Sequence, residues 1–513
     1  MSSLALPREA ARSPAQGGKL ARRAASHGYE IVLGTPLAML AAVLLIQLPK
    51  AVSVDSWLAL VAGRAVWQGG IPQHETLTVL AHGVAWVDQQ WLSQLLSYGI
   101  YLVGGLALLG LVNVGLLISG VAGATLAGRR LGAPFLSTLI ALPMCATMIT
   151  PSREVRTQEF AIPLFMALAY LLVRDGRSPS RRVFWCLPIL TLWANLHGTV
   201  TMGAMLVALY GATGLWERRR RLLHHARAWW RPLGLIFGAG VSILLTPYGL
   251  AIVGYYHGTM VNSTLRHAVT EWQPVTTTTT TSIALFLVAG IALWSFGRNP
   301  AKTTLWEKLA FLVLAASAIT VIRNALFFGL FALMILPVSA AVGTPGRALS
   351  SGPGARRTRI NGTIAMLGVG ALALALAVTF MRPDSTIEYY AQRPGVLRAV
   401  QRATQTDPTL RVMGDERYTD WLLWRDPALA GRMAYDVRYE LLTPGQIQSL
   451  ESLFAQNSPD WKQVSRGYRL IVLSHRYDPG TFVSMRSEPG ARVLYDDGQQ
   501  MVLLRSAAQA ARG

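Results

Sequence analysis

Long apolar runs separated by short polar connections fill the chain up to about residue 381. A helix needs about 20 apolar residues to cross a bilayer, and runs near that length predict about eleven transmembrane helices. Their ranges are 31–49, 106–127, 133–150, 159–173, 183–199, 200–215, 233–247, 282–297, 304–321, 325–342 and 363–381. Two stretches after the first run, 54–68 and 86–104, are rich in Trp and Tyr and predict helices that lie on the membrane surface.

The pattern changes after residue 381, where apolar runs become short and alternate with helical stretches. Strands are predicted at 410–413, 432–435, 469–474, 491–495 and 500–504, with helices near 416–424 and 444–455. We therefore predict a mainly α protein. It has a cytoplasmic tail (1–30), a polytopic transmembrane domain (31–381) whose first outer loop covers 50–105, and an extracytoplasmic C-terminal α/β domain (382–513).

The composition favours a membrane location. Of the 513 residues, 52% are hydrophobic and 14% are charged, whereas about a quarter are charged in soluble domains. The net charge of +21 would suggest nucleic acid, but Lys and Arg concentrate in alternate connections, such as Arg181–Arg182 and Arg218–Arg221. The positive-inside rule places these connections in the cytoplasm. This predicts a bacterial inner-membrane protein with a cytoplasmic N-terminus, an extracytoplasmic C-terminus and no nucleic-acid partner.

Ionisable residues gather at the ends of the spans that this topology places outside. Such groups are costly near hydrocarbon and usually functional. They are Asp55, His74, Glu75 and Asp88 in the first outer loop, with Arg153, Arg156, His197, Glu271 and Arg323 in later ones. Their convergence on one face predicts a working site outside the cell.

The first outer loop also resembles a known family. The stretch VDSWLALVAGRAVWQGGIPQHETLTVLAHGVAWVDQQWL is similar to the corresponding loop of the GT-C superfamily of membrane glycosyltransferases, which includes the protein O-mannosyltransferases and the aminoarabinose transferase of lipid A. In that family an acid heads a surface helix, and a G-x-x-P turn leads to a second acid. The matching positions are Asp55, the turn Gly69–Pro72 and Glu75. The segments WANLHG, TPYG, EWQP, IRN and YDVRYELLT resemble a bacterial branch of GT-C-like proteins.

The resemblance implies an inverting transfer from a polyprenyl-phosphate sugar to a lipid, glycan or protein acceptor. Asp55 would be the catalytic base, and Glu75 or Asp88 would orient the acceptor or hold a divalent cation (Mg or Mn). Arg153, Arg156 and Arg323 would bind the phosphate, with His197 and Glu271 as further donor contacts. Many GT-C enzymes carry paired acids after the first span, whereas Asp55 stands alone between Val54 and Ser56. No metal set is firm, and if a metal is bound its candidate ligands are Asp55, His74 and Glu75.

Each of these residues also has a structural interpretation. Asp55 could cap the surface helix, and His74 and Glu75 could be solvated turn residues. His197 and Asn195 could hydrogen-bond between helices, and the arginines could snorkel or pair with Glu154 and Glu159. Glu271 could be part of an interface anchor with Trp272. In the tail, Asp436 and Arg438 end a predicted strand, which suits either a binding site or an ion pair within the fold.

Two other functions fit the pattern. A secondary transporter or lipid-linked-sugar flippase would place ionisable residues near the bilayer midplane and often shows repeats, whereas the span centres are nearly free of charge. A non-catalytic envelope scaffold would use the tail to bind partners.

Overall fold

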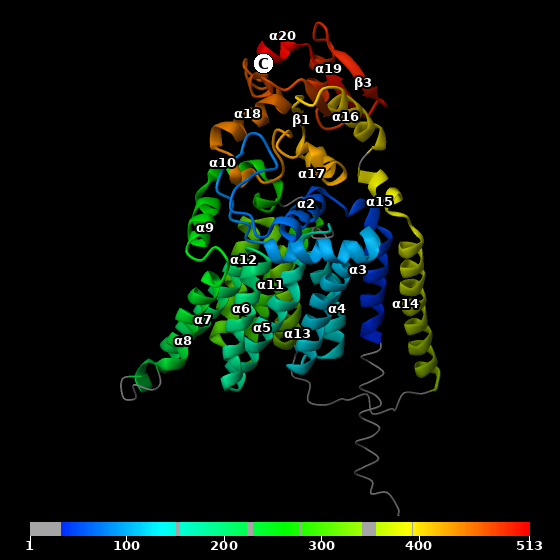
Figure 1. The fold of residues 1–513 in the computed structure, drawn as a ribbon. Helices are drawn as coiled ribbons and strands as arrows, with labels where there is room; N and C mark the ends of the chain where they lie inside the picture. Colours follow the sequence, from blue (N-terminus) through cyan, green and yellow to red (C-terminus); the bar gives the residue numbers. More distant parts are fainter. Residues whose placement is uncertain are drawn as a thin grey trace, which may run out of the picture.

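The computed structural model describes residues 32–149, 154–222, 229–276, 279–340, 355–391 and 393–512, and it confirms the predicted fold class. Each predicted span coincides with a helix of a bundle (Figure 1). These are the helix Val32–Ile46, the second part of α3 (Trp91–Arg130), α4 (Phe135–Ala146), α5 (Ala161–Arg177), α6 (Cys186–Leu196), α7 (Val200–Leu222), α8 (Trp230–Leu244), α11 (Thr280–Arg298), α12 (Leu305–Thr320), α13 (Ala325–Ser339) and α14 (Ala355–Met381).

Several of these helices are built to lie in a membrane. Among the described residues, four are long and apolar enough to cross one, namely Trp91–Arg130, Thr280–Arg298, Ile322–Ser339 and Ile360–Met381. Exposed tryptophans lie toward the C-terminal ends of α7 and α11, and an arginine side chain covers each. The Arg219 guanidinium lies 4.3 Å from the Trp216 ring centroid, and Arg298 lies 5.1 Å from that of Trp294. Trp and Arg together are typical of a membrane–water interface.

Helix α13 is the centre of the bundle. All its residues are buried, which is expected of a helix that is hydrophobic all round. Its phenylalanines make edge-to-face contacts with two neighbouring helices, Phe327 with Phe165 and Phe328 with Phe311, both at 5.0 Å between ring centroids. Helix α3 approaches it closely at Gly128, where a Cβ atom would lie 2.9 Å from the Met334 carbonyl oxygen. Small residues permit such close helix packing in membranes.

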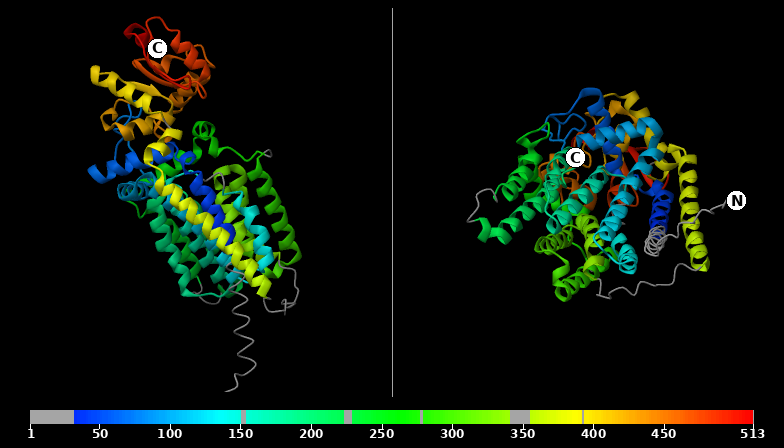
Figure 2. Two further views of the ribbon diagram at one scale, coloured as in Figure 1. Left: turned by 90° about the vertical axis from the view of Figure 1, so that its right-hand side faces the viewer. Right: turned by 90° about the horizontal axis from the view of Figure 1, so that it is seen from below.

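The two predicted surface helices lie across one end of the bundle (Figures 1 and 2). They are α2 (Val54–Gly69) and the first part of α3, which is broken from the second part at Gly104 and Gly105. Gly105 has φ +63°, a conformation that favours glycine. The restarted helix is capped from far along the chain, because Asp384 Oδ1 accepts a hydrogen bond from the Leu106 backbone N–H at 2.9 Å.

The C-terminal α/β part stands above this end of the bundle (Figure 2). Its sheet has the order β1-β2-β4-β3, with β1 (Val412–Gly414) parallel to β2 (Leu470–Ser474), and β4 (Gln500–Leu504) antiparallel to both β2 and β3 (Arg492–Asp496). The predicted helices are α17 (Glu416–Arg425) and α18 (Pro444–Ala455). The sequence did not predict α15 (Asp384–Ala391), α16 (Pro394–Thr406) or α19 (Pro479–Arg486).

The predicted strand 432–435 is wrong as a strand and forms only isolated bridges. Met433 bridges Val412 of β1 on one side and Thr78 of the first loop on the other, both in parallel. Pairing stops there because Gly431 turns the chain with φ +73° and a 3-10 turn begins at Tyr439. The first loop therefore continues the C-terminal sheet, which the sequence did not predict.

The capping role of Asp384 is testable. Asp384→Ala removes the acceptor from the restarted end of α3 and should lower the free energy of unfolding by about 1 kcal/mol, as loss of a helix cap does. Thermal unfolding of the purified protein measures the change. Asp384→Asn keeps the acceptor oxygen and should retain most of the stability, and Asp460→Ala at an exposed site is the control. Equal losses for Asn and Ala would contradict the capping role.

Candidate functional site

A cavity of about 1430 Å³ lies between the end of the bundle that carries α2 and the C-terminal α/β part. The bundle side contributes Asp55, Glu154, Arg156, His197, Glu271 and Arg323 to its wall. The helix α9 (Ala251–Val261) closes one side with Tyr255 and Tyr256. Most of the predicted site residues therefore share one cavity, although they come from segments far apart in the sequence.

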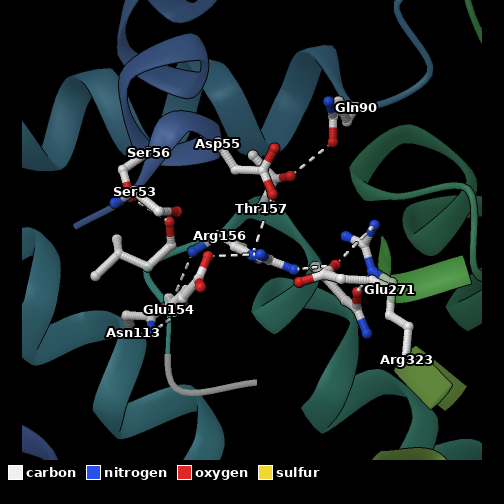
Figure 3. Close-up of polar contacts among 12 residues, drawn as sticks. Ser53, Asp55, Ser56, Gln90, Asn113, Glu154, Arg156, Thr157, Glu271 and Arg323 are labelled. Carbon is white, nitrogen blue, oxygen red and sulfur yellow. Dashed lines mark hydrogen bonds and ion pairs between the residues drawn. The ribbon is translucent and has the colours of Figure 1, made fainter. Parts of the chain in front are cut away.

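Arg156 is the centre of the polar cluster in this cavity (Figure 3). Its Nε lies 3.1 Å from Asp55 Oδ2, its Nη2 lies 2.5 Å from Glu154 Oε2, and its Nη1 pairs with Glu271. The Arg156 side chain is only 10% exposed. All three guanidinium nitrogens are thus engaged by carboxylates, which confirms the predicted alternative that Arg156 pairs with Glu154.

Local hydrogen bonds fix where Asp55 and Arg156 meet. Val155 joins the start of α2 through its backbone, with its N–H donating to the Ala51 carbonyl at 2.9 Å and its carbonyl accepting from the Ser56 hydroxyl at 2.6 Å. Ser53 and not Asp55 is the N-cap of α2, and the Ser53 backbone N–H donates to the Ser56 hydroxyl oxygen at 3.0 Å. Asp55 lies in the first turn, where the helix dipole favours a carboxylate, and its side chain is free to face Arg156.

Asn113 of α3 fixes the backbone on either side of Val155. Its side-chain amide donates to the Glu154 carbonyl and its oxygen accepts from the Arg156 backbone N–H, both at 3.3 Å. Asn113 lies inside the predicted span 106–127, and a polar side chain within an apolar run is the signal that could have identified this role. Gln158, which the sequence analysis did not consider, accepts a hydrogen bond from Arg323.

The charges of the cluster hold one another ionised. Burial would lower the pKa of Arg156, but Asp55, Glu271 and Glu154 raise it well above its usual value. Burial would likewise raise the pKa of Glu271, but its hydrogen bond and ion pair with Arg156 lower the pKa below its usual value. Arg323 is less tightly ion-paired than Arg156, since its Nη1 lies 3.9 Å from the Glu271 carboxylate. His197 is buried beside the cavity, with Nδ1 3.0 Å from the Thr199 hydroxyl.

Glu75 lies outside the lining of the cavity, in a buried ion cluster. Its Oε2 is 2.5 Å from Arg438 Nη1, and its Oε1 accepts hydrogen bonds from the backbone N–H groups of Leu77 and Thr78 at 2.6 and 2.8 Å. Arg438 also pairs with Asp436, and its guanidinium carbon lies 4.3 Å from the Trp86 ring centroid. Asp436 and Arg438 thus form the ion pair within the fold that was one of the two interpretations, and Glu75 is no solvated turn residue.

The three residues expected to hold a metal are not brought together. Asp55 faces the cavity, Glu75 is buried with Arg438, and His74 is exposed in a bridge to Ala85. No group of three or more His, Cys, Asp or Glu side chains within the described ranges is placed to hold a metal ion. This set does not fit a divalent cation. Arg153 lies outside the described residues.

Solved structures share this fold. The chain matches ArnT from Cupriavidus metallidurans in the apo state with a TM-score of 0.52 and 14% identity, over 94% of this chain and 99% of ArnT. The fold is that of the GT-C membrane glycosyltransferases. The same enzyme bound to undecaprenyl phosphate matches with a TM-score of 0.50 and 14% identity, over 91% and 98%.

An archaeal enzyme shares the fold over a smaller part of its own length. The oligosaccharyltransferase AglB from Archaeoglobus fulgidus, in complex with an inhibitory peptide and a dolichol-phosphate, matches with a TM-score of 0.50 and 10% identity, over 92% of this chain and 74% of AglB. No protein-family model and no curated protein sequence matches the chain. The resemblance predicted from the first outer loop is confirmed as a shared fold.

The buried cluster around Arg438 should contribute strongly to stability. Glu75→Ala leaves the buried guanidinium with one carboxylate fewer and the backbone N–H groups of Leu77 and Thr78 without their acceptor. Breaking a buried ion pair in this way typically costs roughly 3–5 kcal/mol. Thermal unfolding and limited proteolysis of the first loop measure the loss. The adjacent exposed His74→Ala is the matched control, and equal effects of the two substitutions would show that Glu75 is not held as described.

Asp88 gives a pH dependence. It is buried, and burial raises its pKa to about 7, so the folded state binds the proton more tightly than the unfolded state, where the pKa is about 4. The contribution of Asp88 to stability is complete below about pH 4 and is lost as the pH rises to about 7. Asp88→Asn should therefore raise the melting temperature at pH 8 and flatten its decline between pH 5 and pH 8. An unchanged profile in this variant would contradict the assignment.

Proposed function

We propose that this chain is a membrane glycosyltransferase that moves a sugar from a polyprenyl-phosphate donor to a cell-envelope acceptor on the extracytoplasmic face. The observation that carries the proposal is the position of Asp55. Its carboxylate is one-third exposed in a large cavity at the end of a GT-C bundle, and Arg156 holds it in place. ArnT, which has the same fold, has been solved with undecaprenyl phosphate bound, and this supports a lipid-linked donor here.

Asp55 acts as the general base in this mechanism. The acceptor hydroxyl oxygen attacks the anomeric carbon of the donor sugar while its proton passes to an Asp55 carboxylate oxygen. The bond between the anomeric carbon and the phosphate oxygen breaks, and the lipid phosphate leaves with the electron pair. Attack from the face opposite the phosphate inverts the anomeric configuration. A positioned base contributes about 10²–10⁴-fold to such a step.

Arg323 is the better candidate for the leaving phosphate. Arg156 is already surrounded by Asp55, Glu154 and Glu271, so an incoming phosphate would have to compete with three carboxylates. Arg323 lies 3.9 Å from its carboxylate partner Glu271 and lines the same cavity. A guanidinium offers phosphate two parallel hydrogen bonds. Arg156 then serves to orient Asp55, and His197 lies beside the donor.

The membrane orientation belongs to the same proposal. The Arg–Trp pairs lie toward the C-terminal ends of α7 and α11, whose N-terminal ends are near the cavity residues Thr201 and Glu271. The basic connections that follow these helix ends were predicted to face the cytoplasm. Anionic lipid on the cytoplasmic leaflet attracts such basic ends. The cavity and the C-terminal part would then face outward, where the donor must be lipid-linked because nucleotide sugars are absent.

Asp55→Asn tests the assignment of the base. In a deletion strain, the wild-type gene should restore an envelope glycolipid or glycoprotein that Asp55→Asn fails to restore, with transfer reduced by about 10²-fold or more. Mass spectrometry of extracted envelope glycolipids and glycoproteins measures the product. Glu217→Gln, at an exposed position on the opposite side of the bundle, should behave as wild type. Full restoration by Asp55→Asn would favour a scaffold, and sugar uptake into vesicles without transfer would favour a transporter.

A further inference from the structure

We propose that the C-terminal part carries a saccharide-binding subsite, so that the acceptor is a sugar hydroxyl of a glycan or glycolipid headgroup and not a polypeptide side chain. This inference rests on the proposed function and names the acceptor class for the same cavity. The subsite is the wall opposite the Arg156 cluster. It is formed by Glu416, Arg417, Tyr439, Tyr477 and Gln500.

The position of this wall in the sheet is typical of a binding site. Glu416 and Arg417 begin α17 shortly after β1, and Tyr477 follows β2 within a few residues. The two strands are parallel neighbours, so their carboxyl ends meet at the same edge of the sheet. In α/β sheets, ligands bind outside the carboxyl ends of the strands. This edge faces the cavity that also contains Asp55.

The wall combines acceptors, donors and aromatic rings. Glu416 Oε2 accepts a hydrogen bond from the Tyr439 hydroxyl at 3.1 Å, which orients the carboxylate. Beside it, the Arg417 guanidinium carbon lies 4.2 Å from the Tyr477 ring centroid, and the Tyr477 side chain is half exposed. A sugar hydroxyl donates and accepts hydrogen bonds at once, so it needs both kinds of group within reach. Carboxylate, guanidinium and tyrosine provide them on one surface.

Gln500 gives an independent indication of a ligand. Its side-chain oxygen is buried, and no group in the described part of the chain donates a hydrogen bond to it. Buried polar atoms are nearly always hydrogen-bonded. Gln500 is itself partly exposed and belongs to the cavity lining, so a rotation of its side chain brings this oxygen within reach of a bound hydroxyl.

A polypeptide acceptor would be expected to use a different surface. Extended peptides commonly bind by adding a strand to a free sheet edge. The edge strand β3 does not line the cavity, and β1 is covered on its outer side by Met433 and the first loop. The cavity therefore presents side chains and not a backbone edge, and side-chain recognition suits a compact polyhydroxylated group.

The test is a binding measurement on the full chain in lipid nanodiscs. Immobilised trisaccharides of glucose, mannose, galactose and N-acetylglucosamine are the probes, with a peptide array beside them. At least one saccharide should bind, and Glu416→Gln and Gln500→Ala should each weaken that binding by about tenfold, as expected for loss of a hydrogen bond to a charged or buried group. Glu451→Gln, at an exposed position on α18, is the matched control. Melting temperatures should stay close to wild type, because the amide introduced by Glu416→Gln keeps an oxygen for Tyr439 and the Gln500 oxygen has no partner to lose.

The outcomes separate this inference from the proposed function. Asp55→Asn should bind the same saccharide as wild type while losing transfer. Saccharide binding without any transfer by the wild type would overturn the glycosyltransferase proposal and leave the subsite standing. Binding of peptides alone, no binding of any saccharide, or transfer whose acceptor KM is unchanged in Glu416→Gln and Gln500→Ala would overturn the subsite.

Discussion

The ion cluster around Arg156 is the interaction on which the candidate site depends. One guanidinium gathers carboxylates from the start of α2, from the connection after α4 and from the loop before α11. The Arg156 side chain is largely removed from water, whereas its three carboxylate partners are about one-third exposed. The buried guanidinium therefore depends on these carboxylates for charge compensation. The geometry of Asp55 is therefore set by residues from three segments and not by α2 alone.

A second guanidinium, that of Arg438, holds together the interface between the C-terminal part and the first loop. Arg438 links the C-terminal part to the first loop through its ion pair with Glu75. Beside this pair, the backbone of residues 77–80 forms hydrogen bonds with the backbone of residues 431–434. Arg64 of α2 adds hydrogen bonds to the carbonyls of Leu423 and Trp424 at the end of α17. These contacts fix the C-terminal part relative to the end of the bundle. The volume of the cavity between them therefore depends on both parts being assembled.

The sequence predicted the helices and their breaks, because these depend on patterns within short stretches of chain. Apolar runs of bilayer length located the helices, and the Gly104–Gly105 pair stands at the predicted boundary between a surface helix and a span. The topology brought Asp55, Arg156, His197, Glu271 and Arg323 to one face, where the structure places them around one cavity. Glu75 was predicted as a site residue because its neighbour sequence resembles a family motif. Its partner Arg438 lies far along the chain, and no periodicity or spacing in the sequence reports such a pairing. The segment around Met433 was predicted as a strand because its apolar residues suit one. Its pairing is limited by a glycine turn and by a distant loop, and the local sequence does not report these limits.

The cap on α3 has a consequence for how the molecule is made. The helix that restarts after Gly105 is inserted early in synthesis, yet its capping carboxylate belongs to a residue that follows the last span. Until then that helix end has a backbone N–H without its acceptor, and the first loop likewise waits for Arg438. Contacts between such distant segments form slowly and leave intermediates exposed. The start of this helix and the first loop thus gain these partners only after the last span has been made, so the C-terminal segment completes the contacts that join the two parts of the molecule.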